Sequence, residues 1–334
     1  MQIEHVLYVV DTHTEGEPTR IVIAGLPNIP GKSIAEKRDY IMKNMDWIRT
    51  AVIFEPRGHI DSFGAILLPA TSEEADFGLI FMDSGGYLDM CGHGTMGVAT
   101  ALVELGFVKP AEPITEIKFE TPAGTVIAKV HVKNGRIQNV TVRDVPSFFV
   151  KTVKLEIPNI GKITADISFG GNFYVLVDAS QIGIEVKPRN IKKLIDLGLK
   201  IREIANKSVK VKHPTKPFIN KIKLVMFYEE VSKREFKNVV IFGKGSFDRS
   251  PCGTGTASRL AALYAKNKIS MGEEIVSQSI IGTKFIARIV EKTRIGEYIA
   301  IIPELTGRAY ITAQTYIIID KNDPLRYGFL VTSD

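Results

Sequence analysis

The pentapeptide Cys-Gly-x-Gly-Thr occurs twice in this chain, and this repetition constrains the fold more than any other feature of the sequence. The two copies are Cys91–Thr95 and Cys252–Thr256. Each copy is followed by apolar residues at helical spacing, which predicts one helix over 96–105 and another over 257–266. The repetition therefore indicates two similar halves, each with a helix that begins at the same five residues.

The segments around the pentapeptides extend this similarity. Residues 13–16 and 170–173 precede the two cysteines at comparable spacing. A strand pair around a glycine turn is predicted after each helix, over 117–130 and 274–290. The sequence thus predicts an α/β (α+β) chain of two pseudo-symmetric lobes.

The chain must pass between the lobes after each helix, and we place these crossings near residues 122 and 285. The first lobe is then 1–122 plus 285–334 and carries Cys91, whereas the second lobe is 123–284 and carries Cys252. Apolar runs predict further strands, and a capping box at Ser33 and Glu36 starts a helix that runs toward Ile48. The strands are expected over 3–10, 51–54 and 64–68, and a second amphipathic helix over Ile191–Ala205.

Composition excludes several classes of protein. The 334 residues are 45% apolar and 24% charged, as in an ordinary globular protein. The net charge of +6 is local, because 12 Lys and Arg residues but only Asp196 and Glu203 lie between Lys187 and Lys223. We interpret that segment as a solvated helix face and loop, not as a nucleic-acid site.

The sequence also indicates in which compartment the protein is expected. The sequence has neither an apolar run long enough to span a membrane nor a signal-peptide pattern at its start, so no membrane association is expected. Two cysteines are too few for the disulfide framework of a secreted domain. We therefore expect a cytoplasmic protein.

A cysteine directly before a helix has its sulfur beside unpaired backbone N–H groups at the positive end of the helix dipole. This position favours the thiolate by lowering the pKa of the thiol, and the same amides can bind a carboxylate. If both helices point into one cleft, Cys91 and Cys252 face opposite sides of a small anion. Racemisation needs this geometry, because one group removes a proton from one face of a carbon while another delivers a proton to the opposite face.

No cofactor or metal is predicted. The chain has no Rossmann glycine fingerprint between a strand and a helix, no GxxxxGK[ST] loop and no HExxH motif.

Four motifs together resemble the proline racemase family, whose fold is the two-lobed one of diaminopimelate epimerase. The resemblance covers nearly the whole chain, and its last two motifs are highly specific. The motifs are Asp11–Arg20, Glu55–His59, Met90–Thr95 and Asp248–Thr256. The resemblance implies that each lobe is a mostly antiparallel sheet wrapped around a central helix, with the active site in the cleft between the lobes.

The resemblance also implies a role for each residue of the two cysteine motifs. Cys91 and Cys252 would be the paired acid and base of a cofactor-independent racemase or 2-epimerase. The substrate carboxylate would be held by the amides of Gly92, His93, Gly253 and Thr254, and its ring nitrogen by Asp248 and the His93 side chain. Phe63 and Phe242 fall at positions that resemble the aromatic walls of the proline pocket. We expect His13, Arg20, Arg57 and His59 to make structural hydrogen bonds instead.

The choice of substrate stays open at this point. Proline, 4-hydroxyproline or both are compatible with the motifs, because an apolar pocket rejects an extra hydroxyl only modestly. Dehydratases of trans-3-hydroxy-L-proline in the family typically carry threonine at the position of Cys252, so the second cysteine argues for racemase or epimerase chemistry. A protein that binds a small carboxylate without catalysis is the alternative from another class. The resemblance further implies a homodimer.

The two thiols carry a redox liability. In a closed cleft the sulfurs of Cys91 and Cys252 can approach disulfide distance, and oxidation would remove both bases at once. We therefore expect activity to require a reductant.

Overall fold

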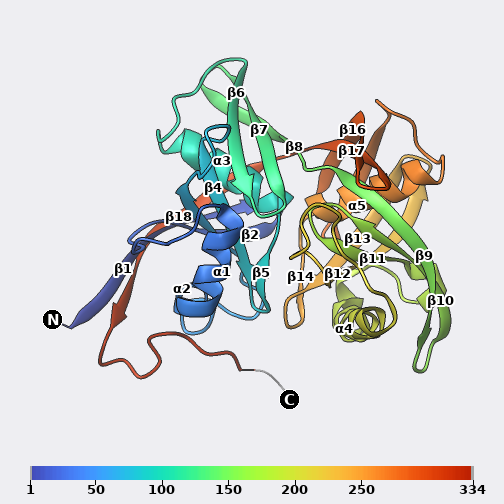
Figure 1. The fold of residues 1–334 in the computed structure, drawn as a ribbon, viewed down its shortest axis with the longest axis horizontal. Helices are drawn as coiled ribbons and strands as arrows, with labels where there is room; N and C mark the ends of the chain where they lie inside the picture. Colours follow the sequence, from blue (N-terminus) through green and yellow to red (C-terminus); the bar gives the residue numbers. More distant parts are fainter. Residues whose placement is uncertain (1, 332–334) are drawn as a thin grey trace.

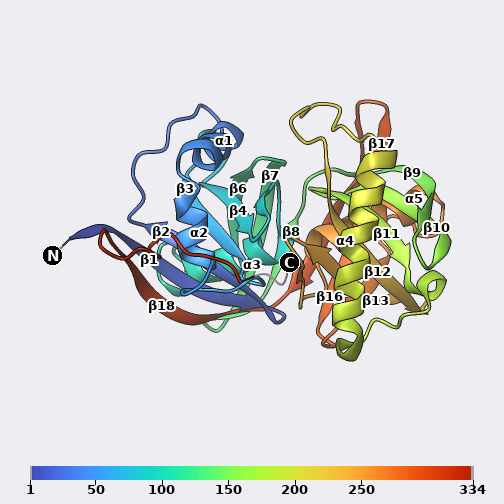
Figure 2. The same ribbon diagram turned by 90° about the horizontal axis from the view of Figure 1, so that it is seen from below.

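The computed structural model describes residues 2–331, which form two lobes side by side (Figures 1 and 2). In each lobe a curved sheet surrounds one buried helix, α3 in the first lobe and α5 in the second. The elements of the first lobe are β1 (Ile3–Thr14), β2 (Glu17–Ala24), α1 (Ile34–Asn44), α2 (Trp47–Ile53), β3 (Gly64–Pro69), β4 (Phe77–Asp83), β5 (Gly86–Leu88), α3 (Gly92–Glu104), β6 (Ile114–Thr121), β7 (Gly124–Lys133), β8 (Arg136–Arg143) and β18 (Ala309–Asp320).

The second lobe follows in the chain and returns to the first through its last strand. Its elements are β9 (Ser147–Ile157), β10 (Gly161–Phe169), β11 (Phe173–Asp178), η1 (Ala179–Ile182), η2 (Pro188–Asn190), α4 (Ile191–Ser208), β12 (Ile222–Ser232), β13 (Glu235–Phe242), β14 (Ser246–Phe247), α5 (Gly253–Ala265), β15 (Glu274–Gln278), β16 (Lys284–Ile295) and β17 (Tyr298–Gly307).

The strand orders of the two lobes match. The first lobe pairs its strands as β18–β1–β2–β3–β4–β6–β7–β8, and the second as β9–β10–β11–β12–β13–β15–β16–β17. In both series only the third pair and the fifth pair are parallel, and a helix crosses over between the strands of each parallel pair, as parallel pairing requires. The predicted pseudo-symmetric, mostly antiparallel fold is confirmed.

Strand β17 joins the two sheets. It pairs with β9 at Ala300 and Ile301, which closes the second sheet on itself, and with β8 through Glu304–Gly307. Strands β7 and β8 belong with the first lobe because they pack on α3, whereas β16 and β17 pack on α5. We therefore propose lobe crossings near residues 144 and 308, in place of 122 and 285. On this proposal each lobe keeps the complete strand pair that follows its helix, which moves both crossings later in the chain.

Local sequence explains most of the elements. The Ser33 side chain accepts a hydrogen bond from the Glu36 N–H and caps α1, as predicted. The helix ends at Asn44 and not near Ile48, since a separate helix, α2, begins at Trp47. The strand predicted over 51–54 is wrong, because residues 51–53 end α2 and Phe54 is its C-cap. Their apolar run is buried throughout, and a short buried run does not distinguish strand from helix.

Helix α4 lies on the outer face of the second lobe, where it packs against β12 and β13 (Figure 2). Its buried residues include Leu194, Leu197 and Ile201, and its lysines face solvent. This agrees with a solvated basic face. Among the helices described, none combines the length and the apolar character needed to cross a membrane.

Candidate active site

The two helices that follow the cysteines meet end to end. A Cβ atom placed on Gly92 would lie 2.9 Å from the Cα of Gly253, and one placed on Gly253 would lie 2.8 Å from the Cα of Gly92. Such distances are too short for any side chain, so the first turns of α3 and α5 touch only because both residues are glycine. The first residues of each pentapeptide thus bring the two positive helix ends to one point between the lobes.

A small cavity of about 20 Å³, lined by buried residues, lies at this point. All nine site residues predicted from the sequence line it, together with five that were not predicted. The predicted residues are Phe63, Cys91, Gly92, His93, Phe242, Asp248, Cys252, Gly253 and Thr254; the others are Leu88, Met90, Tyr174, Leu224 and Val240. A cavity of this volume holds about one water molecule, so the side chains or lobes must move apart to admit a larger molecule.

Cys91 is buried and is the N-cap of α3. Its Sγ atom accepts a hydrogen bond from the Gly94 N–H at 3.3 Å and lies 3.2 Å from His93 Nδ1. The same Nδ1 atom is 3.7 Å from Asp248 Oδ2. A chain of polar contacts therefore runs from the first sulfur through His93 to a carboxylate of the second lobe.

Cys252 has a different setting. Its φ angle of +59° lies in the left-handed region, which is strained for a residue with a side chain. The Ser250 hydroxyl accepts a hydrogen bond from the Cys252 N–H, and Asp248 Oδ1 accepts one from the Ser250 N–H. These bonds hold the loop that turns Cys252 into the cavity, where its Sγ atom lies 3.5 Å from the Tyr174 hydroxyl.

Burial raises the pKa of both thiols well above the ordinary value. For Cys91 the Gly94 N–H opposes this effect, while charge on Asp248 and on the Cys252 sulfur adds to it. For Cys252, Asp248 also raises the pKa, and the Tyr174 hydroxyl and the Gly255 amide lower it. The expected net lowering is therefore wrong for the closed site, because loss of solvent outweighs the helix end.

Each lobe holds the loop that precedes the cysteine of the other lobe. Asn172, at the start of β11, accepts a hydrogen bond from the Asp89 N–H at 3.1 Å and donates one to the Met90 carbonyl at 2.8 Å. In return Glu17, at the start of β2, accepts a hydrogen bond from the Arg249 N–H at 2.7 Å. The two lobes thus make reciprocal contacts, one from Asn172, inside the segment 170–173, and one from Glu17, directly after the segment 13–16.

Glu17 is the least expected of these residues. Its side chain is fully buried, its Oε1 atom has no hydrogen-bond partner among the described residues, and burial and the nearby Asp248 raise its pKa well above the usual range. An acidic residue in the first signature motif was a visible signal, but sequence does not show burial. Tyr174, two positions after Asn172, had no signal of its own.

The four signature residues outside the cavity make structural hydrogen bonds, as expected. Arg20 forms an ion pair with Asp11 at 2.8 Å and donates to the Val52 and Arg57 carbonyls. The Arg57 guanidinium donates to the Arg326 carbonyl. Among the described contacts, His13 Nδ1 accepts from the Gly16 N–H and His59 Nδ1 from the Asp61 N–H.

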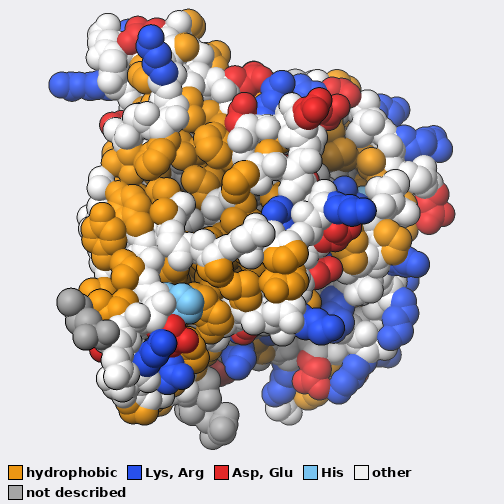
Figure 3. Space-filling view, turned by 60° about the vertical axis from the view of Figure 1, so that its left-hand side comes forward, with side chains coloured by type: hydrophobic (Ala, Val, Ile, Leu, Met, Phe, Trp, Pro, Cys, Tyr) orange, Lys and Arg blue, Asp and Glu red, His pale blue; other side chains and the backbone are white. Residues whose placement is uncertain are grey.

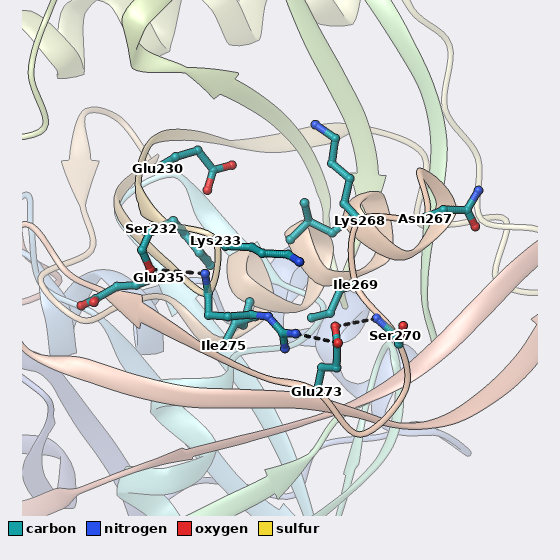
Figure 4. A pocket seen from close by; sticks show the side chains of 13 residues that line it. Glu230, Ser232, Lys233, Glu235, Asn267, Lys268, Ile269, Ser270, Glu273 and Ile275 are labelled. Carbon is teal, nitrogen blue, oxygen red and sulfur yellow. Dashed lines mark hydrogen bonds and ion pairs between the residues drawn. The ribbon is translucent and has the colours of Figure 1, made fainter.

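A larger and more open groove of about 540 Å³ lies elsewhere, between the β12–β13 hairpin and the end of α5 (Figure 4). Its wall carries both charges, and Glu273 pairs there with Arg234 at 2.6 Å and accepts from the Ser270 N–H. The nine predicted residues lie outside its lining. The cavity that the predicted residues line is therefore not the most voluminous one. Within residues 2–331, no group of three or more His, Cys, Asp or Glu side chains has an arrangement that could hold a metal ion.

Comparison with known proteins agrees with this geometry. The family model described as proline racemase matches residues 9–330. The chain is 49% identical to the proline racemase of Acetoanaerobium sticklandii, with 99% of this chain and 100% of the relative covered. It is 41% identical to the 4-hydroxyproline 2-epimerase of Streptosporangium roseum at the same coverage. A crystal structure of a hydroxyproline epimerase from Agrobacterium vitis, with bound trans-4-OH-L-proline, superposes with a TM-score of 0.95 at 32% identity, covering 100% of this chain and 98% of the other.

Proposed function

The chain belongs to the proline racemase family, and on this premise we propose that it is a cofactor-independent isomerase that interconverts L-proline and D-proline. The observation that carries the proposal is the meeting of two helix starts at one cavity, with the sulfurs of Cys91 and Cys252 both in its wall. Two sulfurs at one small site supply a base and an acid for the two faces of one carbon.

In one direction, the thiolate of one cysteine removes the α-proton of proline. The C–H bond breaks, an S–H bond forms, and the electron pair spreads from the α-carbon into the carboxylate. The thiol of the other cysteine then delivers its proton to the opposite face, which leaves the second sulfur as a thiolate and inverts the carbon. In the reverse direction Cys91 and Cys252 exchange roles.

The state of the two thiols suits this reaction. Charge on Cys252 raises the pKa of Cys91, so ionisation of one buried sulfur disfavours ionisation of the other. The two sulfurs therefore ionise one at a time, so that a thiolate on one cysteine leaves the other as a thiol. One thiolate and one thiol are what each direction of the reaction requires.

The remaining polar groups would bind the two ends of the amino acid. The amides of Gly92, His93, Gly253 and Thr254 belong to the first turns of α3 and α5, and we expect them to hold the carboxylate and the charge that develops on it. Asp248 and the His93 side chain lie together in the cavity wall and would bind the secondary ammonium.

The rest of the wall favours proline over 4-hydroxyproline. Besides Tyr174, six apolar side chains complete the lining, and the rings of Phe63 and Phe242 meet edge to face at 6.1 Å. The six are Phe63, Leu88, Met90, Leu224, Val240 and Phe242. A 4-hydroxyl group placed among them would lose hydrogen bonds to water, although an apolar wall disfavours an extra hydroxyl by only about 10²-fold.

Proton NMR in D2O tests the proposal. Reduced protein is incubated separately with L-proline and with trans-4-hydroxy-L-proline, and the α-proton and the products are followed. We expect loss of the α-proton signal and formation of deuterated D-proline, with slower formation of cis-4-hydroxy-D-proline. Faster turnover of hydroxyproline would reverse the substrate preference. No exchange with either amino acid would refute isomerisation, and assays of pyrroline formation from trans-3-hydroxy-L-proline and of binding of pyrrole-2-carboxylate would then test the dehydratase and the non-catalytic alternatives.

We also propose that the protein acts as a homodimer in the reducing cytoplasm. Both cysteines are free, and the reaction needs them reduced. Hydrophobic side chains cover much of the face of the first lobe seen in Figure 3. The exposed apolar residues of β1 and β18 include Val6, Tyr310, Tyr316 and Ile318. An exposed apolar face of this kind is typical of a subunit interface, and sedimentation analysis measures the oligomeric state.

A further inference from the structure

The partners of the two sulfurs are chemically different although the pentapeptides are alike. Two positions after Cys91 stands His93, whose Nδ1 atom lies 3.2 Å from the Cys91 sulfur. Two positions after Cys252 stands Thr254, and the group in contact with that sulfur is the Tyr174 hydroxyl of β11 at 3.5 Å. Sequence repetition therefore does not extend to the polar group beside each thiol.

Tyr174 is held in place by the residue that replaces the histidine. Its hydroxyl lies 2.5 Å from the Thr254 Oγ1 atom, and its ring is fully buried in the cavity wall. If the Thr254 hydroxyl donates to the Tyr174 oxygen, the phenolic proton is free to point at Cys252. Thr254 and Tyr174 thus form a short relay of hydroxyl groups that ends at the sulfur.

We propose that the Tyr174 hydroxyl is the hydrogen-bond donor that stabilises the Cys252 thiolate. The inference rests on the proposed two-thiol reaction, in which Cys252 must be the base in one direction. A phenol remains a neutral donor throughout the physiological pH range, and burial raises the pKa of Tyr174 further. A neutral phenol is therefore a suitable partner for the buried Cys252 thiolate, because a second charge in the same buried site would cost free energy.

The contact does not depend on closure of the cleft. Both β11 and α5 belong to the second lobe, so Tyr174 and Cys252 stay together when the lobes separate. The other groups that act on this sulfur are Asp248, from the loop before α5, and the Gly255 amide of α5, while the charge of the sulfur itself acts on Cys91 across the cleft. Asp248 raises the pKa of Cys252, and Tyr174 is the side chain that lowers it.

The test measures the ionisation of the Cys252 thiol and does not depend on turnover of proline. In a Cys91→Ser background only Cys252 is available, and its rate of alkylation by iodoacetamide is followed by mass spectrometry from pH 6 to 11. Tyr174→Phe removes the hydroxyl and keeps the ring. We expect the midpoint of the alkylation profile to rise by about one pH unit, with the rate at pH 8 about tenfold lower, because a hydrogen bond to a charged group is lost.

Two controls separate this effect from a general disturbance. Tyr264→Phe removes a tyrosine hydroxyl at the far end of α5 and should leave the Cys252 profile unchanged. In a Cys252→Ser background, Tyr174→Phe should leave the Cys91 profile unchanged. The inference is overturned if the Cys252 alkylation midpoint is the same with tyrosine and with phenylalanine at position 174. It is also overturned if Tyr174→Phe shifts the midpoints of both cysteines equally. Neither result depends on turnover, so failure here is distinct from failure of the proposed function.

A second pair of variants tests the same hydrogen bonds if Tyr174→Phe folds poorly. Thr254→Val breaks the relay but keeps the phenol, and we expect a smaller upward shift of the Cys252 midpoint. Thr254→Ser keeps the hydroxyl and should keep the parent profile, while identical profiles for valine and serine would overturn the relay. In the enzyme with both thiols, Tyr174→Phe should lower kcat/KM about tenfold at pH 8 for both enantiomers equally, with a smaller loss at higher pH.

Discussion

The contact between the two helix starts makes Gly253→Ala the sharpest test of the site geometry. The added Cβ would lie 2.8 Å from the Cα of Gly92, where ordinary contacts are 3.4–4 Å. The helix starts must therefore separate by about 1 Å, and a misplacement of that size costs about 10²-fold in rate. Overpacking of the contact should also lower stability by about 1–3 kcal/mol.

The assay is kcat/KM for L-proline by polarimetry, together with thermal unfolding. Gly198→Ala is the matched control, because its Cβ would lie 2.8 Å from the Ile241 side chain on the outer face of β13, under α4. It should lose stability by a comparable amount and keep kcat/KM. If Gly253→Ala keeps full activity and an unchanged Tm, the helix starts are not in contact and the reasoning fails.

Three further predictions concern the thiols and a buried acid. Cys91→Ser and Cys252→Ser should each lower kcat/KM by about 10³-fold or more, since a hydroxyl exchanges protons poorly at neutral pH. If polarimetry shows that either variant racemises proline at the parental rate, a two-thiol reaction is excluded. Diamide should abolish activity, and dithiothreitol should restore it. If thiol titration shows that both sulfurs are oxidised and activity is nevertheless complete, this prediction is refuted. Burial raises the pKa of Asp144 to about 7. Between pH 4 and 7 the native state therefore holds a proton that the unfolded state has lost. Asp144 should thus make the free energy of unfolding fall by roughly 4 kcal/mol over this range. Asp144→Asn should remove this fall in denaturant titrations at both pH values, and an unchanged slope would show that the carboxyl is ionised in the fold.

Residues close in sequence determined a large part of the fold. The repeated pentapeptide predicted two lobes with equivalent helices, and the Ser33 cap and the spacing within Ile191–Ala205 predicted two further helices, because capping and amphipathic periodicity act over a few residues. The two cysteine motifs contain seven of the nine predicted residues that line one cavity, and the family resemblance added Phe63 and Phe242. Short apolar runs did not carry enough information to distinguish strand from helix, which is why 51–54 was predicted as a strand although 51–53 end α2.

Other properties arise only when distant segments meet. The pKa of a thiol at a helix start depends on how much water it keeps, and the closed lobes reverse the direction expected for Cys91 and Cys252. Tyr174 reaches the second sulfur from a separate strand, and Glu17 reaches Arg249 from the other lobe. Sequence by itself determined where the thiols and helix ends are, because these are local features. Tertiary structure decided their ionisation and their partners, because burial and contact between lobes depend on the whole fold.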